Sequence, residues 1–314
     1  MKYVIGADIG GTTVKLGLFT EEGELLDKWE INTDISDDGK NVLPDIAASI
    51  DSKLKEKEIS KDLVIGAGFG VPGPVLPDGT VNKCNNLGWG VINIKEKFKE
   101  LSGLDAFAGN DANVAALGEA WKGGGKKANN VVVVTLGTGV GGGVIINGKI
   151  ITGANGAAGE IGHIPVVEDE TDSCGCGKQG CLEQYSSANG LVKVAKRILA
   201  EDNAESKLRN FENLTAKDVC DCAYEKDELA LKAIKYSMDL LGRGLASISC
   251  VADPEVFVIG GGLSKSGDLL LDPMKESFVK NAFHASRGAK FKLAELGNDA
   301  GIYGAAKLVL IDEE

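Results

Sequence analysis

Short hydrophobic runs separated by polar and glycine-containing turns dominate the start of the chain. Residues 3–8, 14–19 and 25–31 are rich in apolar and β-branched side chains. Runs of this length and composition predict three consecutive strands that form an antiparallel β-meander. Residues 42–57 instead repeat their apolar positions at helical spacing, which predicts an amphipathic helix.

The alternation of predicted strands and helices continues and begins again after the Lys- and Gly-rich stretch 122–127. Further strands are predicted at 64–69, 106–108, 131–136, 143–146, 149–151 and 256–260, and further helices at 94–101, 111–121, 190–200, 215–224, 228–251 and 301–310. Each half opens with a strand–turn–strand whose turn carries Gly and Thr, DIGGTTVKLGLF in the first and TLGTGVGGGVII in the second. The pattern predicts an α/β protein with a weak internal repeat.

The second glycine turn also fits the spacing of a dinucleotide-binding motif. Gly137, Gly139 and Gly142 satisfy G-x-G-x-x-G, and the strand predicted at 131–136 is the preceding element that the motif requires. A Rossmann turn opens a helix, however, whereas the residues after Gly142 predict a second strand and a tight Asn-Gly turn. We therefore interpret the stretch as strand, glycine turn, strand. Such a turn can still bind phosphate through converging backbone N–H groups.

Composition and charge exclude several classes of protein. The chain has 314 residues, 43% of them hydrophobic, which is enough for two domains with buried cores. A net charge of −12 and a pI near 4.8 argue against nucleic acid as a general partner. The apolar N-terminal run is interrupted at Asp8 and no later run is long enough to span a bilayer, so neither a signal peptide nor a membrane anchor is expected. Seven cysteines, an odd number, favour the reducing cytoplasm.

The first glycine turn places a carboxylate next to groups that can bind phosphate. Asp8 ends a predicted strand, and the segment Gly10, Gly11, Thr12, Thr13 can present N–H and O–H donors. A carboxylate in this position can hold the water shell of Mg²⁺ beside a nucleotide, and an ordinary hairpin turn is the alternative. Thr138 and Gly139 form the matching turn of the second half. Lys15 follows the first turn and is either a phosphate neighbour or a solvated surface lysine.

Three of the seven cysteines are clustered in the sequence C-G-C-G-K-Q-G-C. Cys174, Cys176 and Cys181, with His163 eleven residues upstream, offer a Cys₃His ligand set. Such a set suits tetrahedral Zn²⁺, and because four protein ligands leave no open position the zinc is expected to be structural. Free thiols in a glycine-rich loop are the alternative.

A further pair of polar residues stands where a predicted strand gives way to a helix. From the local sequence alone, Asp111 is interpreted as the N-cap of that helix, next to Asn110. Glu119 falls two helical turns later and is interpreted as a helix-face residue.

Seven motifs follow one another along the chain: DIGGTTVKLGLF, GFGVPGPV, NNLGW, GNDANVAALGE, TLGTGVGGGVIINGKIITGANGAAGEIGH, CGCGKQGCLE and VIGGGLS. In this order they resemble the motifs of the ROK family (repressor, open reading frame, kinase), particularly of its bacterial glucokinases. The resemblance implies a two-domain α/β fold of the actin and hexokinase type (ribonuclease H-like), with duplicated β-meander domains around an interdomain cleft. It implies a smaller N-terminal domain at 1–121, a larger C-terminal domain at 122–300 and a C-terminal helix at 301–314 that packs back on the first domain.

The resemblance also implies roles for the motif residues. Asp111 would be the catalytic base rather than a cap, because a sugar hydroxyl is a poor nucleophile until a carboxylate accepts its proton. The sugar would contact Gly70, Asn85, Asn110, Asp111, Glu160, His163 and Glu183. The nucleotide would contact Asp8, Gly10, Gly11, Thr12, Thr13, Lys15, Thr138, Gly139, Gly261 and Gly262. If one ring nitrogen of His163 binds Zn²⁺, the other can donate to a sugar hydroxyl.

The activity implied is transfer of the γ-phosphoryl group of ATP, with Mg²⁺, to the 6-hydroxyl of glucose by a cytoplasmic homodimer. Kinases for fructose, N-acetylglucosamine or N-acetylmannosamine share the same frame and stay open as alternatives. A sugar-sensing repressor of the family would need an added helix-turn-helix domain, for which the first strand at residue 3 leaves no room. An actin-like filament or a chaperone would have no use for Asn110, Asp111, Glu160 and the zinc set.

Overall fold

The computed structural model describes residues 1–311, apart from the side chain of Asn85. This part of the chain divides into two compact units. Unit 1 comprises residues 1–127, 143–159 and 295–311, and unit 2 comprises residues 128–142 and 160–294. Within the described residues, no helix is long and apolar enough to cross a membrane.

Unit 1 is built on a five-stranded sheet with the strand order β3-β2-β1-β4-β7. The strands β1 (Tyr3–Ile9), β2 (Thr13–Thr20) and β3 (Leu25–Asn32) form the predicted antiparallel meander. The strands β4 (Val64–Val71) and β7 (Ala106–Asn110) extend the sheet in parallel with β1. Because β1, β4 and β7 point the same way, their carboxyl ends meet at one edge of the sheet.

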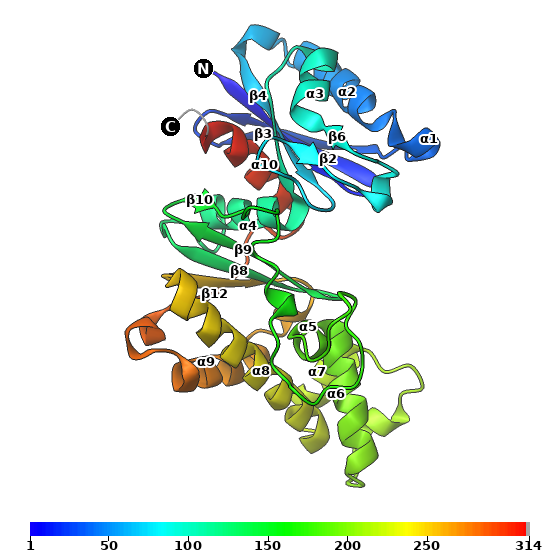
Figure 1. Ribbon diagram of the computed structural model, residues 1–314, viewed down its shortest axis with the longest axis vertical. Helices are drawn as coiled ribbons and strands as arrows, with labels where there is room; N and C mark the ends of the chain where they lie inside the picture. The colour runs from blue at the N-terminus through cyan, green and yellow to red at the C-terminus, as the bar shows by residue number, and fades with distance from the viewer. Residues whose placement is uncertain (312–314) are drawn as a thin grey trace. The chain divides into compact units, whose positions relative to one another are not determined.

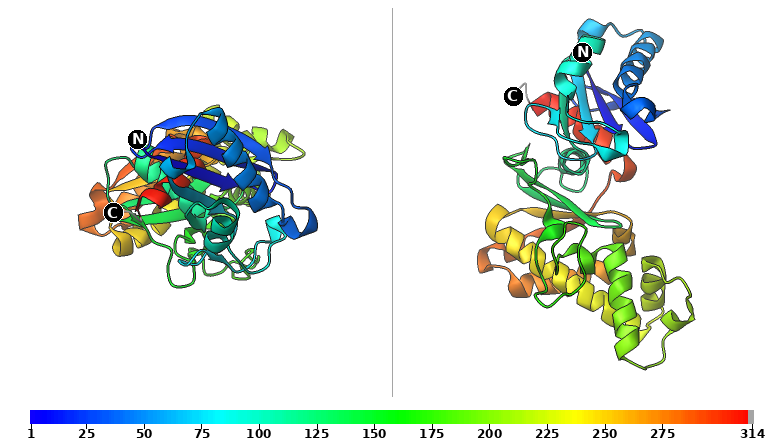
Figure 2. Two further views of the ribbon diagram at one scale, coloured as in Figure 1. Left: turned by 90° about the horizontal axis from the view of Figure 1, so that it is seen from above. Right: turned by 45° about the vertical axis from the view of Figure 1, so that its right-hand side comes forward.

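Helices cover both faces of this sheet (Figure 1). The helices α2 (Val42–Glu56) and α3 (Ile94–Ser102) bury their apolar side chains on one face, against alternate residues of the meander such as Ile5. The helix α10 (Ala300–Ile311) covers the other face, where Ile302 packs with Val4, and it also packs on α4 (Asp111–Lys122). Figure 2 shows α10 against the sheet from a second side. The smaller elements of unit 1 are α1 (Ser36–Gly39), β5 (Thr80–Val81) and β6 (Ile92–Asn93).

A second five-stranded sheet has the order β10-β9-β8-β11-β12. Its strands are β8 (Val131–Leu136), β9 (Val140–Ile146), β10 (Lys149–Ile150), β11 (Val256–Gly260) and β12 (Lys290–Leu293). The helices of unit 2 are α5 (Glu183–Ser186), α6 (Ala188–Glu201), α7 (Ala216–Tyr224), α8 (Glu228–Ala252) and α9 (Asp268–Asn281). The sequence pattern did not predict α9, which contains Pro273. Proline is disfavoured inside helices, and here the packing of α9 on α8 outweighs that preference.

Candidate active site

Two aspartates meet at the carboxyl edge of the sheet in unit 1. Asp8 lies near the end of β1 in register with Gly70 of β4, and Asp111 begins α4 directly after β7. A Cβ atom built on Gly70 would lie 3.5 Å from Asp8 Oδ1 and 3.6 Å from the Cα atom of Asp111. The missing side chain of Gly70 therefore leaves open space between the two acidic residues.

The surroundings of both carboxylates oppose their ionisation. Burial raises the pKa of Asp111, although hydrogen bonds from the Ala112 backbone and the Asn110 side chain pull in the opposite direction. Burial is also the main reason that the pKa of Asp8 is raised, and repulsion from Asp111 raises it further, whereas Lys15 lowers it. A carboxylate with a raised pKa is a stronger proton acceptor, which suits Asp111 to general-base chemistry.

Asn110, not Asp111, caps the helix that follows. Asn110 Oδ1 accepts a hydrogen bond from Asn113 N at 3.1 Å, which is the N-cap interaction of α4. Asn110 Nδ2 donates to Asp111 Oδ1 at 2.9 Å and to Gly73 O at 3.1 Å. The cap interpretation of Asp111 is thus wrong. Asn110 holds the Asp111 carboxylate in place and ties it to the loop that contains Gly73.

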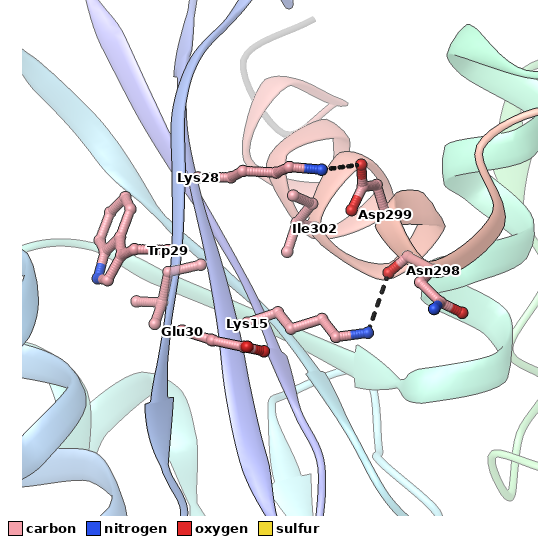
Figure 3. A pocket seen from close by; sticks show the side chains of 8 residues that line it. Lys15, Lys28, Trp29, Glu30, Asn298, Asp299 and Ile302 are labelled. Atoms are coloured by element: carbon pink, nitrogen blue, oxygen red, sulfur yellow. Dashed lines mark hydrogen bonds and ion pairs between the residues drawn. The ribbon is translucent and has the colours of Figure 1, made fainter.

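Lys15 lies beside Asp8 but its amine is engaged elsewhere. It pairs with Asp8 of β1 on one side and with Glu30 of β3 on the other. Figure 3 shows Lys15 Nζ donating to the carbonyl oxygen of Asn298, at 3.3 Å, at the edge of a cavity of about 300 Å³. In this geometry Lys15 acts on Asp8 through its charge.

The turn after Asp8 is compact and its tip is exposed. Gly10 N donates to Thr13 O at 3.0 Å, and Thr33 Oγ1 donates to Gly10 O at 2.7 Å. Gly11 and Thr12 are exposed at the tip. Gly11 and Thr12, two of the four expected phosphate donors, therefore face solvent, whereas the N–H group of Gly10 is used within the turn.

The matching turn in unit 2 is held by Glu183. Its Oε2 atom accepts a hydrogen bond from Val140 N at 3.0 Å, and a Cβ atom on Gly139 would overlap the same oxygen. Thr138 is exposed at the tip of the turn. The predicted sugar ligand Glu183 and the predicted phosphate turn are thus direct neighbours.

The third glycine turn follows β11 in unit 2. Gly261 has a φ of +85°, and a Cβ atom there would overlap Leu136 O, so only glycine fits. At Gly262 a Cβ atom would meet no atom within 4 Å. The backbone at this turn is open to approach by a ligand.

The predicted metal ligands converge. The ligand atoms of His163, Cys174, Cys176 and Cys181 all lie within 4.8 Å of one another. His163 Nδ1 is 3.6 Å from Cys174 Sγ, and Cys176 Sγ is 3.7 Å from Cys181 Sγ. With Zn–S bonds of about 2.3 Å and Zn–N bonds of about 2.0 Å, a tetrahedral zinc needs separations of about 3.5–3.8 Å. The residues fit the ion.

The two ring nitrogens of His163 face different groups. Nδ1 faces the sulfur atoms, and Nε2 lies 3.9 Å from Glu160 Oε2. The Glu160 side chain is 62% exposed and its carboxylate can accept a ligand hydroxyl. The structure thus brings together Glu160, His163, Glu183 and the cysteines in unit 2. Asn85 lies in a short 3₁₀ turn (Asn85–Leu87), and its side chain is outside the described part of the structure.

Two further residues of unit 1 make contacts that the sequence pattern did not predict. Glu119 is 3% exposed rather than on an open helix face, and its carboxylate accepts hydrogen bonds from the backbone N–H groups of Gly124, Glu295 and Leu296 at 2.8–3.0 Å. A Cβ atom on Gly301 of α10 would lie 2.5 Å from Cγ and Oδ2 of Asp8. Both effects depend on chain segments that are distant in sequence, so no local motif marks them.

Comparison with known proteins identifies the family. The model of the ROK family matches residues 4–311. The chain is 42% identical to a glucokinase of Halalkalibacterium halodurans over 98% of this chain and 95% of that protein, and 37% identical to a glucokinase of Streptomyces coelicolor over 98% of both. A crystal structure of a ROK family glucokinase from Streptomyces griseus, in complex with glucose and AMPPNP, is 35% identical, covers 98% of both chains and has a TM-score of 0.71. The predicted hexokinase-like α/β fold is thereby confirmed, and the chain belongs to the ROK family.

Proposed function

We propose that the protein is an ATP-dependent glucokinase that transfers the γ-phosphoryl group of ATP to the 6-hydroxyl of glucose and releases glucose 6-phosphate and ADP. Relatives named glucokinase, 34–42% identical over 98% of this chain, support this activity. The observation that carries it is the position of Asp111, half-buried beside Asp8 at the carboxyl edge of the sheet. A half-buried carboxylate next to a second acidic residue suits a kinase with an alcohol acceptor, because the first can accept the hydroxyl proton and the second can hold the hydrated Mg²⁺.

The proposed chemistry begins at Asp111. Its carboxylate accepts the proton of the sugar hydroxyl while the hydroxyl oxygen attacks the γ-phosphorus, and the bond to the β-phosphate oxygen breaks on the opposite side. Asn110 keeps the carboxylate aimed, because it donates to Asp111 Oδ1 and to Gly73 O at the same time. Asp8 would hold Mg²⁺ through water, and the ion, when bound, neutralises charge on the phosphate oxygens.

The remaining residues divide between the two substrates. Glu160, His163 and Glu183 of unit 2 would accept or donate hydrogen bonds to sugar hydroxyls. Gly70 of β4 and Asn85 would be the further sugar contacts in unit 1. Carboxylates suit this task because each can accept bonds from two adjacent hydroxyls and so distinguish epimers. The exposed turns of both units would bind the phosphates, and the turn at Gly261 and Gly262 would approach the adenosine.

The proposal includes one structural zinc per chain on His163, Cys174, Cys176 and Cys181. The separations of 3.6 and 3.7 Å between ligand atoms support it. With Nδ1 on the ion, His163 would keep Nε2 for a sugar hydroxyl. A homodimer in the cytoplasm belongs to the same proposal, on the strength of the family resemblance alone.

A coupled phosphorylation assay across a panel of sugars tests the proposed activity. We expect glucose to have the highest kcat/KM with ATP among glucose, fructose, mannose, N-acetylglucosamine and N-acetylmannosamine. A kcat/KM tenfold higher for another sugar than for glucose would mean that the other sugar is the preferred acceptor. Turnover of none of them would refute the kinase assignment.

A further inference from the structure

One buried carboxylate of unit 2 has no part in the proposed chemistry. The side chain of Glu170 is 1% exposed and lies in the loop that leads to the metal ligands. Arg197 of α6 donates to both of its oxygens, at 2.8 and 2.9 Å, and Lys193 Nζ lies 3.2 Å away. Chiefly because of Arg197, the pKa of Glu170 is held well below its usual range. This carboxylate is ionised, buried and held by several donors at once.

The same carboxylate holds the short helix that carries Glu183. The hydroxyl of Tyr185 donates a hydrogen bond to Glu170 Oε2. Tyr185 is 2% exposed and lies two residues after Glu183 and four after Cys181. With four residues, α5 is too short to be stable without tertiary contacts. The bond from Tyr185 to Glu170 therefore helps to fix the direction in which α5 presents Glu183.

A second set of bonds joins the Glu170 loop to the metal ligands. Asp172 N donates to Glu170 Oε1 at 2.9 Å, and Asp172 O accepts from Gln184 Nε2 at 2.8 Å. Gln184 Oε1 in turn accepts from Cys181 N at 3.0 Å. Displacement of Glu170 would thus affect both Glu183 and Cys181 through hydrogen bonds that join side chains to backbone groups.

We propose that Glu170, held by Arg197, is a positioning residue. It fixes the loop that carries the metal ligands and the helix α5 that carries Glu183 relative to each other, so that metal retention and glucose affinity depend on the same buried carboxylate. The sugar part of this inference rests on the proposed glucokinase activity, and the metal part does not. The Glu170–Arg197 pair differs from the surface pairs of this unit. Arg243 with Asp239, for example, is an exposed i,i+4 pair on α8, where little effect is expected.

The most selective variant removes one hydroxyl and leaves the buried charges in place. In Tyr185→Phe we expect the glucose KM to rise about fivefold or more, because a hydrogen bond to a charged, buried acceptor is lost. The KM for ATP should stay within twofold. Zn²⁺ should pass to a competing chelator about fivefold faster than from the wild-type protein. Tyr236→Phe is the matched control, since its ring packs edge-on against Tyr185 and its hydroxyl has no hydrogen-bond partner among the described residues.

Variants of the arginine test the clamp itself. Arg197→Met should accelerate Zn²⁺ loss more than Arg197→Lys, which keeps the charge but not the two-pronged contact, and Arg243→Met should leave it unchanged. In the double variant of Tyr185→Phe with Arg197→Lys the two effects should not multiply, because both act through Glu170.

The metal and sugar readouts separate the failure of this inference from the failure of the proposed function. If Tyr185→Phe and Arg197→Lys both match wild type in Zn²⁺ loss, the positioning role is refuted, whatever the sugar. Faster Zn²⁺ loss in a protein without sugar kinase activity would uphold the metal part and refute only the proposed function. Equal rises in the KM of glucose and of ATP would mean that Glu170 has a general structural role, which also overturns the inference.

Discussion

The half-buried carboxylates of Asp8 and Asp111 determine how kcat/KM is expected to change with pH. Burial raises the pKa of Asp111, and burial together with Asp111 raises that of Asp8. A base acts only when it is deprotonated, so we expect kcat/KM to fall as the pH decreases through the raised pKa of Asp111, above the usual aspartate value near 3.8. A rate profile from pH 4 to 8 measures this limb. Because Lys15 lowers the pKa of Asp8, a limb that moves to higher pH in Lys15→Met would assign it to Asp8 instead.

The Asp111→Asn variant should separate activity from stability. We expect kcat to fall by about a hundredfold or more, since the general base is lost, while glucose affinity changes little. The folded pKa is raised, so the ionised carboxylate destabilises the folded protein above that pKa and has no such effect below the unfolded value. Asp111→Asn should therefore unfold at a higher temperature than wild type at pH 7, and the difference should shrink toward pH 4. A variant with wild-type kcat would leave Asp111 without a catalytic role.

Glu119 shows the limit of interpretation from a local pattern. Its helical position predicts a surface side chain, yet the carboxylate accepts three backbone N–H bonds in the interior of unit 1. A glutamine offers one acceptor oxygen in place of two, so Glu119→Gln leaves at least one buried N–H poorly paired and should cost about 1–3 kcal/mol in the free energy of unfolding. Denaturant titration measures the change. The exposed Glu100→Gln of α3 is the control, with an expected change below about 0.5 kcal/mol; equal losses in both variants would contradict the interpretation.

The residues whose candidate roles could be predicted from the sequence have a common property. Asp8, Asn110, Asp111 and the three clustered cysteines lie within short segments whose order and spacing carry their chemistry. Glu119 and Glu170 instead acquire their roles mainly from partners that lie 15 to 177 positions away along the chain. Sequence spacing cannot report such contacts, because they form only when elements pack.

At the scale of elements, α10 reaches the carboxyl edge of the sheet in unit 1, where Asp8 lies. Gly301 in its first turn packs directly on the Asp8 carboxyl group. Gly301→Ala would push a methyl group to 2.5 Å from Asp8 Cγ, so the carboxylate or the helix must move. We expect kcat to fall by on the order of a hundredfold, as for other displacements of about 1 Å in active sites. Steady-state kinetics test this. Gly288→Ala, where a Cβ atom meets nothing within 4 Å, is the control, and full activity of Gly301→Ala would show that Asp8 tolerates displacement.

The elements also show which structural signals are local. The hairpins β1–β2 and β8–β9 follow from apolar runs on either side of glycine turns, and the structure confirms both. The helix α9 contains Pro273, a residue that is disfavoured inside helices, and it forms because it packs on α8. The strand β12 has only four residues and pairs in parallel with β11, so its partner is 34 positions away in sequence. Propensity alone cannot predict either element.

For the whole molecule, the repeated hairpin is the feature that links sequence to architecture. Each unit presents one exposed Gly/Thr turn next to an acidic side chain, Asp8 in unit 1 and Glu183 in unit 2. The two units differ in what supports that turn. In unit 1 Asp8 packs on α10, whereas in unit 2 Glu183 lies on the short helix α5, directly after the loop that holds the cysteines. Loss of a metal should therefore act unequally on the two units.

Removal of Zn²⁺ tests whether metal loss affects unit 2 more than unit 1. The proposed ligands join segments 163, 174–176 and 181 of unit 2, and a structural zinc contributes its binding free energy to the folding of the segments that it joins. After chelation we expect faster hydrogen exchange in residues 160–187 and unchanged exchange in β1 and β4. We also expect a larger loss of affinity for glucose than for ATP, because Glu160 and Glu183 flank the metal ligands. Cys176→Ser should reproduce this pattern, and Cys250→Ser, which changes an exposed cysteine outside the cluster, should not. Elemental analysis of the wild-type protein should find about one zinc per chain. Zinc-free protein with normal exchange and an unchanged glucose KM would leave the three cysteines as free thiols.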